Sequence, residues 1–202
     1  MWRDEIIVAI LIISFFLIPV VIQYFSPPIY PVSAELCKLH LEAMSDDDYI
    51  LRLKKFCAET LNDSIDGLNY TQLLEWEHRH LKYSNETFKR RNRAIDILNV
   101  TRGEDGKALG RCGEFALLYY GLLVANNYTC RVVIDFSVKT DNRTAGDHVW
   151  NEVLIGGEWI HIDPTERIID KPKMYVEEWN KNVNYVLAIT SEEIVEVTDK
   201  YA

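Results

Sequence analysis

The sequence predicts an α+β fold, with a helical amino-terminal half packed on an antiparallel sheet and a transmembrane helix at the amino terminus. One observation is a nearly unbroken apolar run over residues 6–25. Another is the helical spacing of apolar residues between residues 33 and 125. The third is a change after residue 130 to β-branched, alternating segments. Helical segments followed by strands are typical of the α+β class.

Length and composition are those of one globular domain with appendages. The chain has 202 residues, of which 48% are hydrophobic and 26% charged, which is enough apolar material for one core. Its net charge of −9 argues against a nucleic-acid partner, because no basic stripe is present to displace counterions. We expect a membrane anchor over residues 1–25, a Pro-rich spacer over 26–32 and a domain over 33–202.

The apolar run has the length of a membrane span. Twenty helical residues reach about 30 Å, the thickness of the hydrocarbon core of a bilayer. A cleavable signal peptide is the alternative, since residues 32–34 (Val-Ser-Ala) loosely resemble a cleavage site. The run is long for a signal, its preceding segment is barely basic, and Pro27, Pro28 and Pro31 intervene. We therefore favour an uncleaved, single-pass anchor.

Two features place the globular part on the extracytoplasmic side. Arg3 precedes the span and no Lys or Arg follows it until Lys38, so the positive-inside rule keeps the amino terminus in the cytoplasm. The chain also carries six Asn-x-Ser/Thr sequons, where 12 Asn and 18 Ser plus Thr residues in random order would give about one. Such acceptors mark a glycoprotein, although Asn and Thr are also common in turns. The sequons begin at Asn62, Asn69, Asn85, Asn99, Asn127 and Asn142.

Apolar residues recur at helical spacing in five segments, with an acidic triplet at residues 46–48 and a turn at Asp66-Gly67 between them. The last segment is apolar on every side, which predicts a buried helix. The first segment starts at residue 33, and the others cover residues 49–61, 68–81, 94–98 and 115–125.

From residue 130 the pattern predicts strands. Two alternating segments flank Gly156-Gly157, a pair that is typical of a two-residue hairpin turn, and Pro164 ends the second of them. The expected strands are residues 130–138, 148–155, 158–163 and 185–190.

Residues 110–116 (Gly-Arg-Cys-Gly-Glu-Phe-Ala) place a cysteine at or next to the start of the apolar helix. Free N–H groups and the positive end of the helix dipole favour the thiolate form of a thiol there. Cys112 is therefore a candidate nucleophile, and Gly113 would let a substrate approach the backbone. The alternative is a small buried hydrophobic side chain, which is what most cysteines are.

The expected hairpin supplies what a nucleophilic cysteine needs, a base and a group that orients the base. His148 opens one strand and Asp163 closes the other, so antiparallel pairing brings them to the same end of the hairpin. His161, two residues before Asp163, is the alternative base, and the pairing geometry favours His148. The remaining histidines, which are expected to face solvent, are His40, His78 and His80.

No metal and no cofactor are expected. A single thiol without a second histidine at ligand spacing disfavours a metal site, and no CxxC pair is present in the chain. Cys130 lies in an apolar run and should be buried. Cys37 and Cys57 would pair in an oxidising compartment or remain two buried thiols, and the sequence leaves both alternatives open.

Three segments resemble the signature blocks of the transglutaminase-like superfamily. They are residues 110–116, residues 147–153 (Asp-His-Val-Trp-Asn-Glu-Val) and residues 159–166 (Trp-Ile-His-Ile-Asp-Pro-Thr-Glu). The residues of these segments are most similar to those of the peptide:N-glycanases, which are amidases that free N-glycans from asparagine. The resemblance covers roughly residues 73–166.

The resemblance implies a papain-like thiol fold with Cys112 as nucleophile, His148 as base and Asp163 as the residue that orients the base. In this superfamily an upstream aromatic or amide side chain often helps to hold the oxyanion. Trp76 is the candidate by rough position, and the backbone N–H of Cys112 is the other expected donor.

The chain departs from the peptide:N-glycanases in three respects. They carry a zinc site built from CxxC pairs, they are typically cytosolic, and they are larger. The superfamily also holds proteases, cross-linking enzymes and members without activity. The resemblance therefore implies the chemistry rather than the substrate.

Together these features predict a membrane-anchored thiol enzyme that cleaves or transfers at an amide bond through a thioester. Its substrate would be a peptide, a protein side-chain amide or a glycopeptide. A cysteine protease and a cross-linking transglutaminase, in which an amine replaces water, are the alternatives with the same chemistry. A non-catalytic interaction domain at a cell surface is the alternative from another class, and the presence of all three triad residue types disfavours it.

Overall fold

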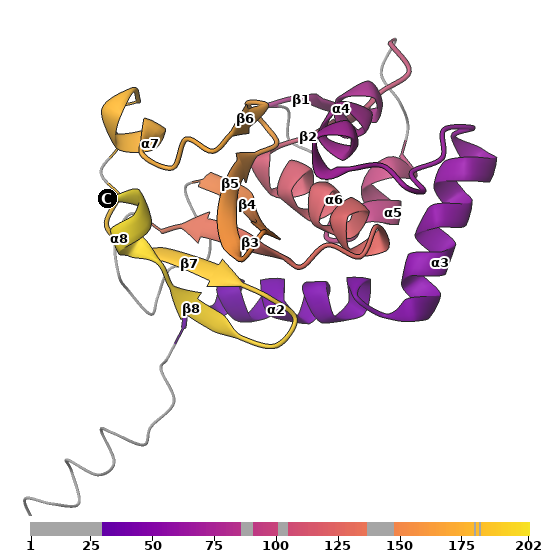
Figure 1. Cartoon of the computed structure of the whole chain (residues 1–202). Coiled ribbons are helices and arrows are strands. Elements are labelled where there is room, and N and C mark those ends of the chain that lie inside the picture. Colours follow the sequence, from indigo (N-terminus) through magenta and orange to yellow (C-terminus); the bar gives the residue numbers. More distant parts are fainter. Residues whose placement is uncertain (1–29, 86–90, 101–104, 137–147, 180, 182) are drawn as a thin grey trace, which may run out of the picture. The chain divides into compact units, whose positions relative to one another are not determined.

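The computed structural model describes residues 30–85, 91–100, 105–136, 148–179, 181 and 183–202. Within these ranges no helix has the length and apolar character to cross a bilayer. The expected anchor over residues 1–25 lies outside the described residues, as does most of the expected spacer. Contacts group Pro31–Ala202 into one unit (Figure 1).

Helix α6 (Cys112–Ala125) lies at the centre of this unit. Eleven of its 14 residues are buried, because it contacts helices as well as strands. The main helices in contact are α3 (Asp47–Lys55), α4 (Tyr70–His80) and α5 (Ala94–Leu98), and the main strands are β3 (Cys130–Asp135) and β4 (His148–Ile155). The prediction of a buried helix that begins beside the cysteine is confirmed.

Two of the helices before α6, α3 and α4, begin at polar side-chain caps. Helix α2 (Val32–Met44) is followed by α3, whose N-cap Asp46 accepts a hydrogen bond from the backbone N–H of Tyr49 at 3.1 Å. The helix predicted over residues 49–61 is instead the end of α3 and a π-helical segment, η1 (Phe56–Thr60). Helix α4 begins at Asn69, which forms a capping box with Gln72.

The main sheet has six antiparallel strands in the order β6-β5-β4-β3-β7-β8. Strands β4 and β5 (Glu158–Asp163) have the predicted bounds, and Gly156 and Gly157 join them with φ angles of 61° and 90°, as a tight hairpin turn requires. The other strands are β6 (Ile168–Ile169), β7 (Val186–Ile189) and β8 (Ile194–Glu196).

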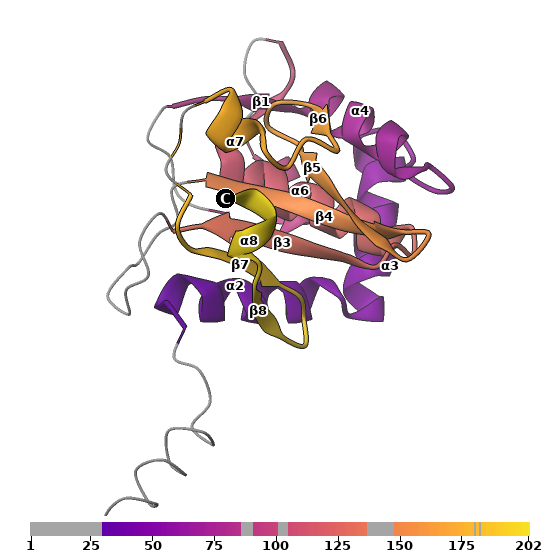
Figure 2. The same ribbon diagram turned by 60° about the vertical axis from the view of Figure 1, so that its left-hand side comes forward.

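Several elements were not predicted from the sequence. A separate parallel pair consists of β1 (Leu81–Tyr83) and β2 (Ala108–Gly110). Two short helices, α7 (Met174–Glu177) and α8 (Thr198–Tyr201), contribute buried residues to a core that includes Trp150. In Figure 2, α8 lies in front of the strands and α6 lies behind them. The sheet is therefore covered on both faces.

The side chains of β4 alternate between the two faces of the sheet, and both faces are buried. In β4, the side chain of Asn151 faces α6, where its Nδ2 donates to the carbonyl oxygen of Ala116 at 3.0 Å. Its neighbours Trp150 and Glu152 face the other side, toward α7 and α8.

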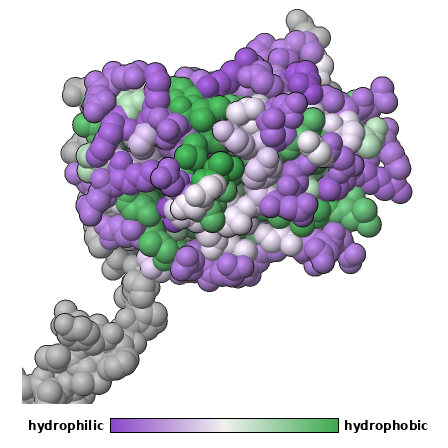
Figure 3. Space-filling view, in the orientation of Figure 1, coloured by the Kyte–Doolittle hydropathy of each residue, from purple (hydrophilic) through white to green (hydrophobic). Residues whose placement is uncertain are grey.

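Figure 3 shows mainly hydrophilic side chains around the rim of the molecule and a smaller group of hydrophobic ones near the middle of this view.

None of the four cysteines, all of which the structure describes, forms a disulfide. Cys57 and Cys130 are buried, whereas Cys37 and Cys112 are partly exposed. The predicted burial of Cys130 is confirmed. Cys37 and Cys57 form no disulfide, and of these two only Cys57 has the burial expected in that case.

We predict that Gly121→Ala destabilises the domain. A Cβ at this position of α6 would lie 2.9 Å from Cβ of Ala94 in α5 and 3.4 Å from Cδ2 of Leu53. Both neighbours are fully buried, and the Cβ of Ala94 can shift only with its backbone, so overpacking should lower the free energy of unfolding by roughly 1–3 kcal/mol. Urea denaturation followed by circular dichroism measures this change.

Gly113→Ala is the matched control in the same helix, since no atom lies within 4 Å of a Cβ there, and it should leave stability unchanged or slightly raised. The double variant Gly121→Ala/Ala94→Gly should recover part of the loss. Equal effects of the two single variants would contradict the packing argument.

Candidate active site

Cys112 is the first residue of α6, and the backbone before it is closely packed. The buried carboxylate of Glu114 accepts a hydrogen bond from the backbone N–H of Arg111 at 3.1 Å. A Cβ on Gly110 would lie 2.9 Å from Cβ of Glu114, so this position has no room for a side chain. These contacts fix the start of the helix and leave the thiol of Cys112 partly exposed.

The hairpin brings His148 and Asp163 together. Nε2 of His148 lies 2.7 Å from Oδ2 of Asp163, and both side chains are buried. The carboxylate also accepts backbone N–H groups from Thr165 at 3.0 Å and Glu166 at 3.3 Å. The carboxylate of Asp163 is thus held by the turn that follows its own strand and by the first residue of the neighbouring strand.

The imidazole of His148 interacts with both other residues of the expected triad. Burial by itself lowers the pKa of His148, but hydrogen bonds with Asp163 and Cys112 raise it to about 9. Since Nε2 is bonded to Asp163, Nδ1 is the nitrogen left for the thiol. Burial would raise the pKa of Asp163, yet the hydrogen bond and charge of His148 hold it below its usual value. We call Cys112, His148 and Asp163 the candidate triad.

His161, the alternative base, occupies a different place in the network. Its Nε2 donates to the hydroxyl of Tyr175 at 2.8 Å, and its Nδ1 accepts the backbone N–H of Lys171 at 3.3 Å. The hydroxyl of Tyr175 in turn donates to Oδ2 of Asp163 at 2.9 Å. Burial lowers the pKa of His161 to about 4, so this imidazole is neutral and supports Asp163 through Tyr175.

Aromatic side chains surround the ring of His148. The ring centroids of Trp150, Tyr175 and Trp179 lie 5.7, 5.5 and 5.7 Å from that of His148. These contacts restrict the imidazole to the orientation in which Nε2 meets Asp163.

A family comparison covers the part of the chain that contains these residues. The model of the transglutaminase-like superfamily matches residues 56–164, just over half of the 202-residue chain. The chain belongs to the transglutaminase-like superfamily. The resemblance found in the three signature segments is confirmed, and the matched range includes the whole candidate triad.

Curated relatives of this transglutaminase-like chain are similar over about half of its length. The peptide-N(4)-(N-acetyl-beta-glucosaminyl)asparagine amidase of Arabidopsis thaliana is 38% identical over 94 residues, which cover 46% of this chain and 12% of the relative. The amidase of the same name from Gallus gallus is 34% identical over 117 residues, which cover 57% of this chain and 16% of the relative. The chain thus spans only a small part of the length of these relatives.

A solved structure shares the transglutaminase-like fold. A chain from a study of DNA duplex opening by the Rad4/XPC nucleotide excision repair complex aligns with a TM-score of 0.50 and 14% identity. The alignment covers 82% of this chain and 46% of that one. At this identity the likeness shows the fold alone.

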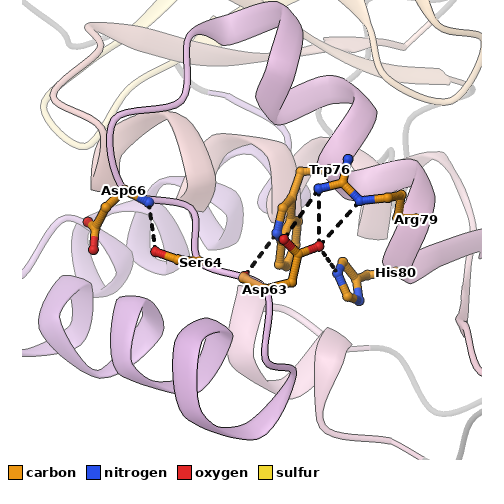
Figure 4. Close-up of polar contacts among 6 residues, drawn as sticks. All are labelled: Asp63, Ser64, Asp66, Trp76, Arg79 and His80. Atoms are coloured by element: carbon orange, nitrogen blue, oxygen red, sulfur yellow. Dashed lines mark hydrogen bonds and ion pairs between the residues drawn. The ribbon is translucent and has the colours of Figure 1, made fainter.

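Trp76 does not take the position expected of an oxyanion donor. The side chain is fully buried, and its Nε1 donates to the backbone carbonyl of Asp63 at 3.0 Å. The carboxylate of Asp63 binds Arg79 and His80, the last at 2.9 Å (Figure 4). An indole has one donor, and here it ties α4 to the loop before it, so we no longer assign Trp76 to the oxyanion.

The prediction that His78 and His80 face solvent is wrong. His80 binds Asp63 and stacks on Trp76, with ring centroids 4.2 Å apart. Nε2 of His78 donates to the carbonyl oxygen of Pro164 at 2.5 Å, and its ring contacts Phe115 at 5.2 Å. His78 therefore connects α4 to the turn that follows Asp163.

The structure assigns positions to two residues that the sequence did not single out. Tyr175 lies in a four-residue helix without an apolar period, and Trp179 follows that helix. Neither belongs to a motif, so no local signal could have placed them beside His148.

We predict that His148 titrates far above an ordinary histidine. In the wild-type protein its imidazole should show a pKa of about 9, because hydrogen bonds with Asp163 and Cys112 outweigh burial. Cys112→Ala removes one of these bonds and should lower the pKa of His148, and Asp163→Asn should lower it further. NMR titration of labelled imidazoles measures both shifts.

His161 is the internal reference in the same spectra, since it should stay neutral down to about pH 4 in the Cys112→Ala variant. A histidine whose folded pKa is raised stabilises the fold below its unfolded pKa of about 6.5. The free energy of unfolding should therefore fall as the pH rises through about 9. A wild-type His148 titrating near 6.5 would contradict the assigned contacts.

Proposed function

We propose that this chain is a thiol-dependent amide hydrolase or acyltransferase that uses the candidate triad. The observation that carries the proposal is the position of one imidazole between a buried carboxylate and a partly exposed thiol. A base oriented by a carboxylate and bonded to a nucleophile is what thiol catalysis requires. A binding module would have no use for such a costly buried charge pair.

The proposed reaction has two steps. Sγ of Cys112 attacks the amide carbonyl carbon after its proton has passed to His148, and a C–S bond forms. His148 then gives that proton to the departing amine nitrogen as the C–N bond breaks, which leaves a thioester. Water attacks the thioester with His148 as base, releasing the acid and regenerating the thiol.

The backbone offers a donor for the oxyanion of these steps. Cys112 is the first residue of α6, and the first N–H groups of a helix have no acceptor within the helix. The N–H of Cys112 and the positive helix end would therefore face the developing negative charge on the substrate oxygen.

We propose a glycosylated asparagine side chain as the first substrate to test, because the curated relatives are named as glycan-asparagine amidases. A plain peptide tests for a protease, and a glutamine donor with a primary amine tests for a transferase. Aspartate and a free glycosylamine are the expected products of the glycopeptide. We further propose that residues 1–25 anchor the enzyme to a membrane, with the domain on the extracytoplasmic side.

We predict that Cys112 is the thiol that iodoacetamide alkylates fastest at neutral pH. Cys57 and Cys130 are buried, and burial raises the pKa of the Cys57 thiol to about 12, so both should react slowly. His148→Ala should slow the alkylation of Cys112 because the base is lost. Mass spectrometry of digested, time-quenched samples gives the rate for each thiol.

Cys37 is the control, since it is also partly exposed but does not belong to the candidate triad. Cys112→Ala should abolish amidase activity on every substrate while leaving the unfolding midpoint nearly unchanged. Equal labelling rates for Cys37 and Cys112, or full activity of Cys112→Ala, would discard the proposed function.

We predict that Tyr175→Phe lowers kcat and leaves KM nearly unchanged. The hydroxyl of Tyr175 donates to Oδ2 of Asp163 at 2.9 Å, so its loss weakens the hold on the carboxylate without touching the substrate. A hydrogen bond to a charged group contributes about 1.5–3 kcal/mol, which corresponds to a loss of roughly tenfold to a hundredfold in kcat. Steady-state kinetics with the active substrate measures the changes in kcat and in KM separately.

Tyr201→Phe is the matched control. Tyr201 is equally buried and packs on Trp150, but its hydroxyl donates to Glu152 at 2.8 Å instead of Asp163. The Tyr201→Phe variant should have a lower free energy of unfolding without a comparable loss of kcat. Similar kinetics for the two variants would assign Tyr175 a purely structural role.

A further inference from the structure

We propose that the domain is N-glycosylated at the five sequon asparagines that the structure describes. They are Asn62, Asn69, Asn85, Asn99 and Asn127, and the sixth sequon asparagine, Asn142, lies outside the described residues. The proposal rests on the proposed extracytoplasmic placement of the domain, but it does not depend on the catalytic role of Cys112.

Exposure distinguishes the described sequon asparagines from three of the four other asparagines that the structure describes. All five described sequon asparagines are exposed. Of the four other described asparagines, Asn92 and Asn126 are half-buried, Asn151 is buried and only Asn184 is exposed. A glycosyltransferase can reach only an exposed side chain, and all five described sequon asparagines meet this requirement.

The atom that accepts a glycan is also available in the sequon residues. In Asn126 and Asn151, which are not sequon residues, Nδ2 donates to backbone carbonyls of α6 at 3.0 Å. Asn69 and Asn85 instead use Oδ1, which accepts bonds from Thr71 and Tyr83 at 2.7 and 2.9 Å. Within the described part of the chain, Nδ2 of each of the five makes no hydrogen bond, so attachment of a sugar would break none.

Two of the sites lie far from the candidate triad. Asn127 follows the end of α6, and Asn69 starts α4 beside it, where the rings of Tyr70 and Tyr128 meet at 6.3 Å. Cys112 lies at the other end of α6, and a helix of 14 residues is about 21 Å long. Glycans at Asn69 and Asn127 would leave the thiol uncovered.

The modification needs a lipid-phosphate-linked oligosaccharide and the transferase of an export pathway. Nδ2 would form a bond to the anomeric carbon as the bond from that carbon to the phosphate oxygen breaks. The lipid phosphate leaves with the electron pair, and the proton from Nδ2 passes to a base of the transferase. No oxidant or reductant takes part.

The full chain, purified from its own cells, is digested and its peptides are examined by mass spectrometry. Peptides with Asn69 and Asn127 should carry a glycan, and Asn184, which is exposed but outside a sequon, should be bare. Thr129→Ala should lose the glycan at Asn127 alone, whereas Thr129→Ser keeps the sequon and should keep the glycan. The side chain of Thr129 is exposed, so both variants should fold.

A Cys112→Ala chain is measured in parallel, because an active glycan amidase acting on itself would leave aspartate at a sequon. Glycans in this variant together with aspartate in the wild type also support the proposal. Unmodified asparagine at all five positions in both chains would overturn it, as would a glycan that persists at Asn127 in Thr129→Ala. Neither result bears on whether Cys112 is catalytic.

Discussion

The charge on Asp163 is the constraint around which the rest of this domain is arranged. A fully buried carboxylate is strongly unfavourable unless every lone pair is used. Here His148, Tyr175 and the backbone N–H groups of Thr165 and Glu166 all donate to it. These donors come from a neighbouring strand, a short helix and the turn after β5. Satisfying one charge therefore fixes the register of the hairpin, the position of α7 and the path of the chain beyond the sheet.

The alternation of strand β4 divides the structural roles between the two faces of the sheet. His148, Trp150 and Glu152 point toward α7 and α8, where aromatic rings and paired charges meet. Asn151 and Val153 point the other way, toward the apolar helix α6. Cys112 begins α6 and His148 begins β4, so the thiol and the imidazole meet at the edge of the sheet where both elements start. Packing on both faces of the sheet keeps these two side chains in place.

The sequence predicted the elements whose signals are local. The hairpin over residues 148–163 follows from strict alternation around two glycines, and the helix that begins at Cys112 follows from a long apolar run. Tyr175 escaped prediction because its helix of four residues is too short to have a period. Trp76 and His78 were placed on a helix correctly, but the direction of a side chain depends on neighbours from distant segments. Their partners, a loop carbonyl and the carbonyl of Pro164, are visible only after folding.

Two histidines of one hairpin show how environment assigns opposite roles to the same side chain. His148 has a carboxylate on one nitrogen and a thiol for the other, so its cationic form is favoured despite burial. His161 is also buried, and the nearby negative charges of Asp163 and Glu152 favour its cationic form. Its hydrogen bonds, however, are to the neutral hydroxyl of Tyr175 and from the backbone N–H of Lys171. An acceptor nitrogen cannot be protonated without losing that bond, so desolvation prevails and the ring stays neutral. The pKa values of the two imidazoles are thus moved apart. His148 can carry a proton beside the thiol of Cys112, whereas His161 stays neutral beside Tyr175.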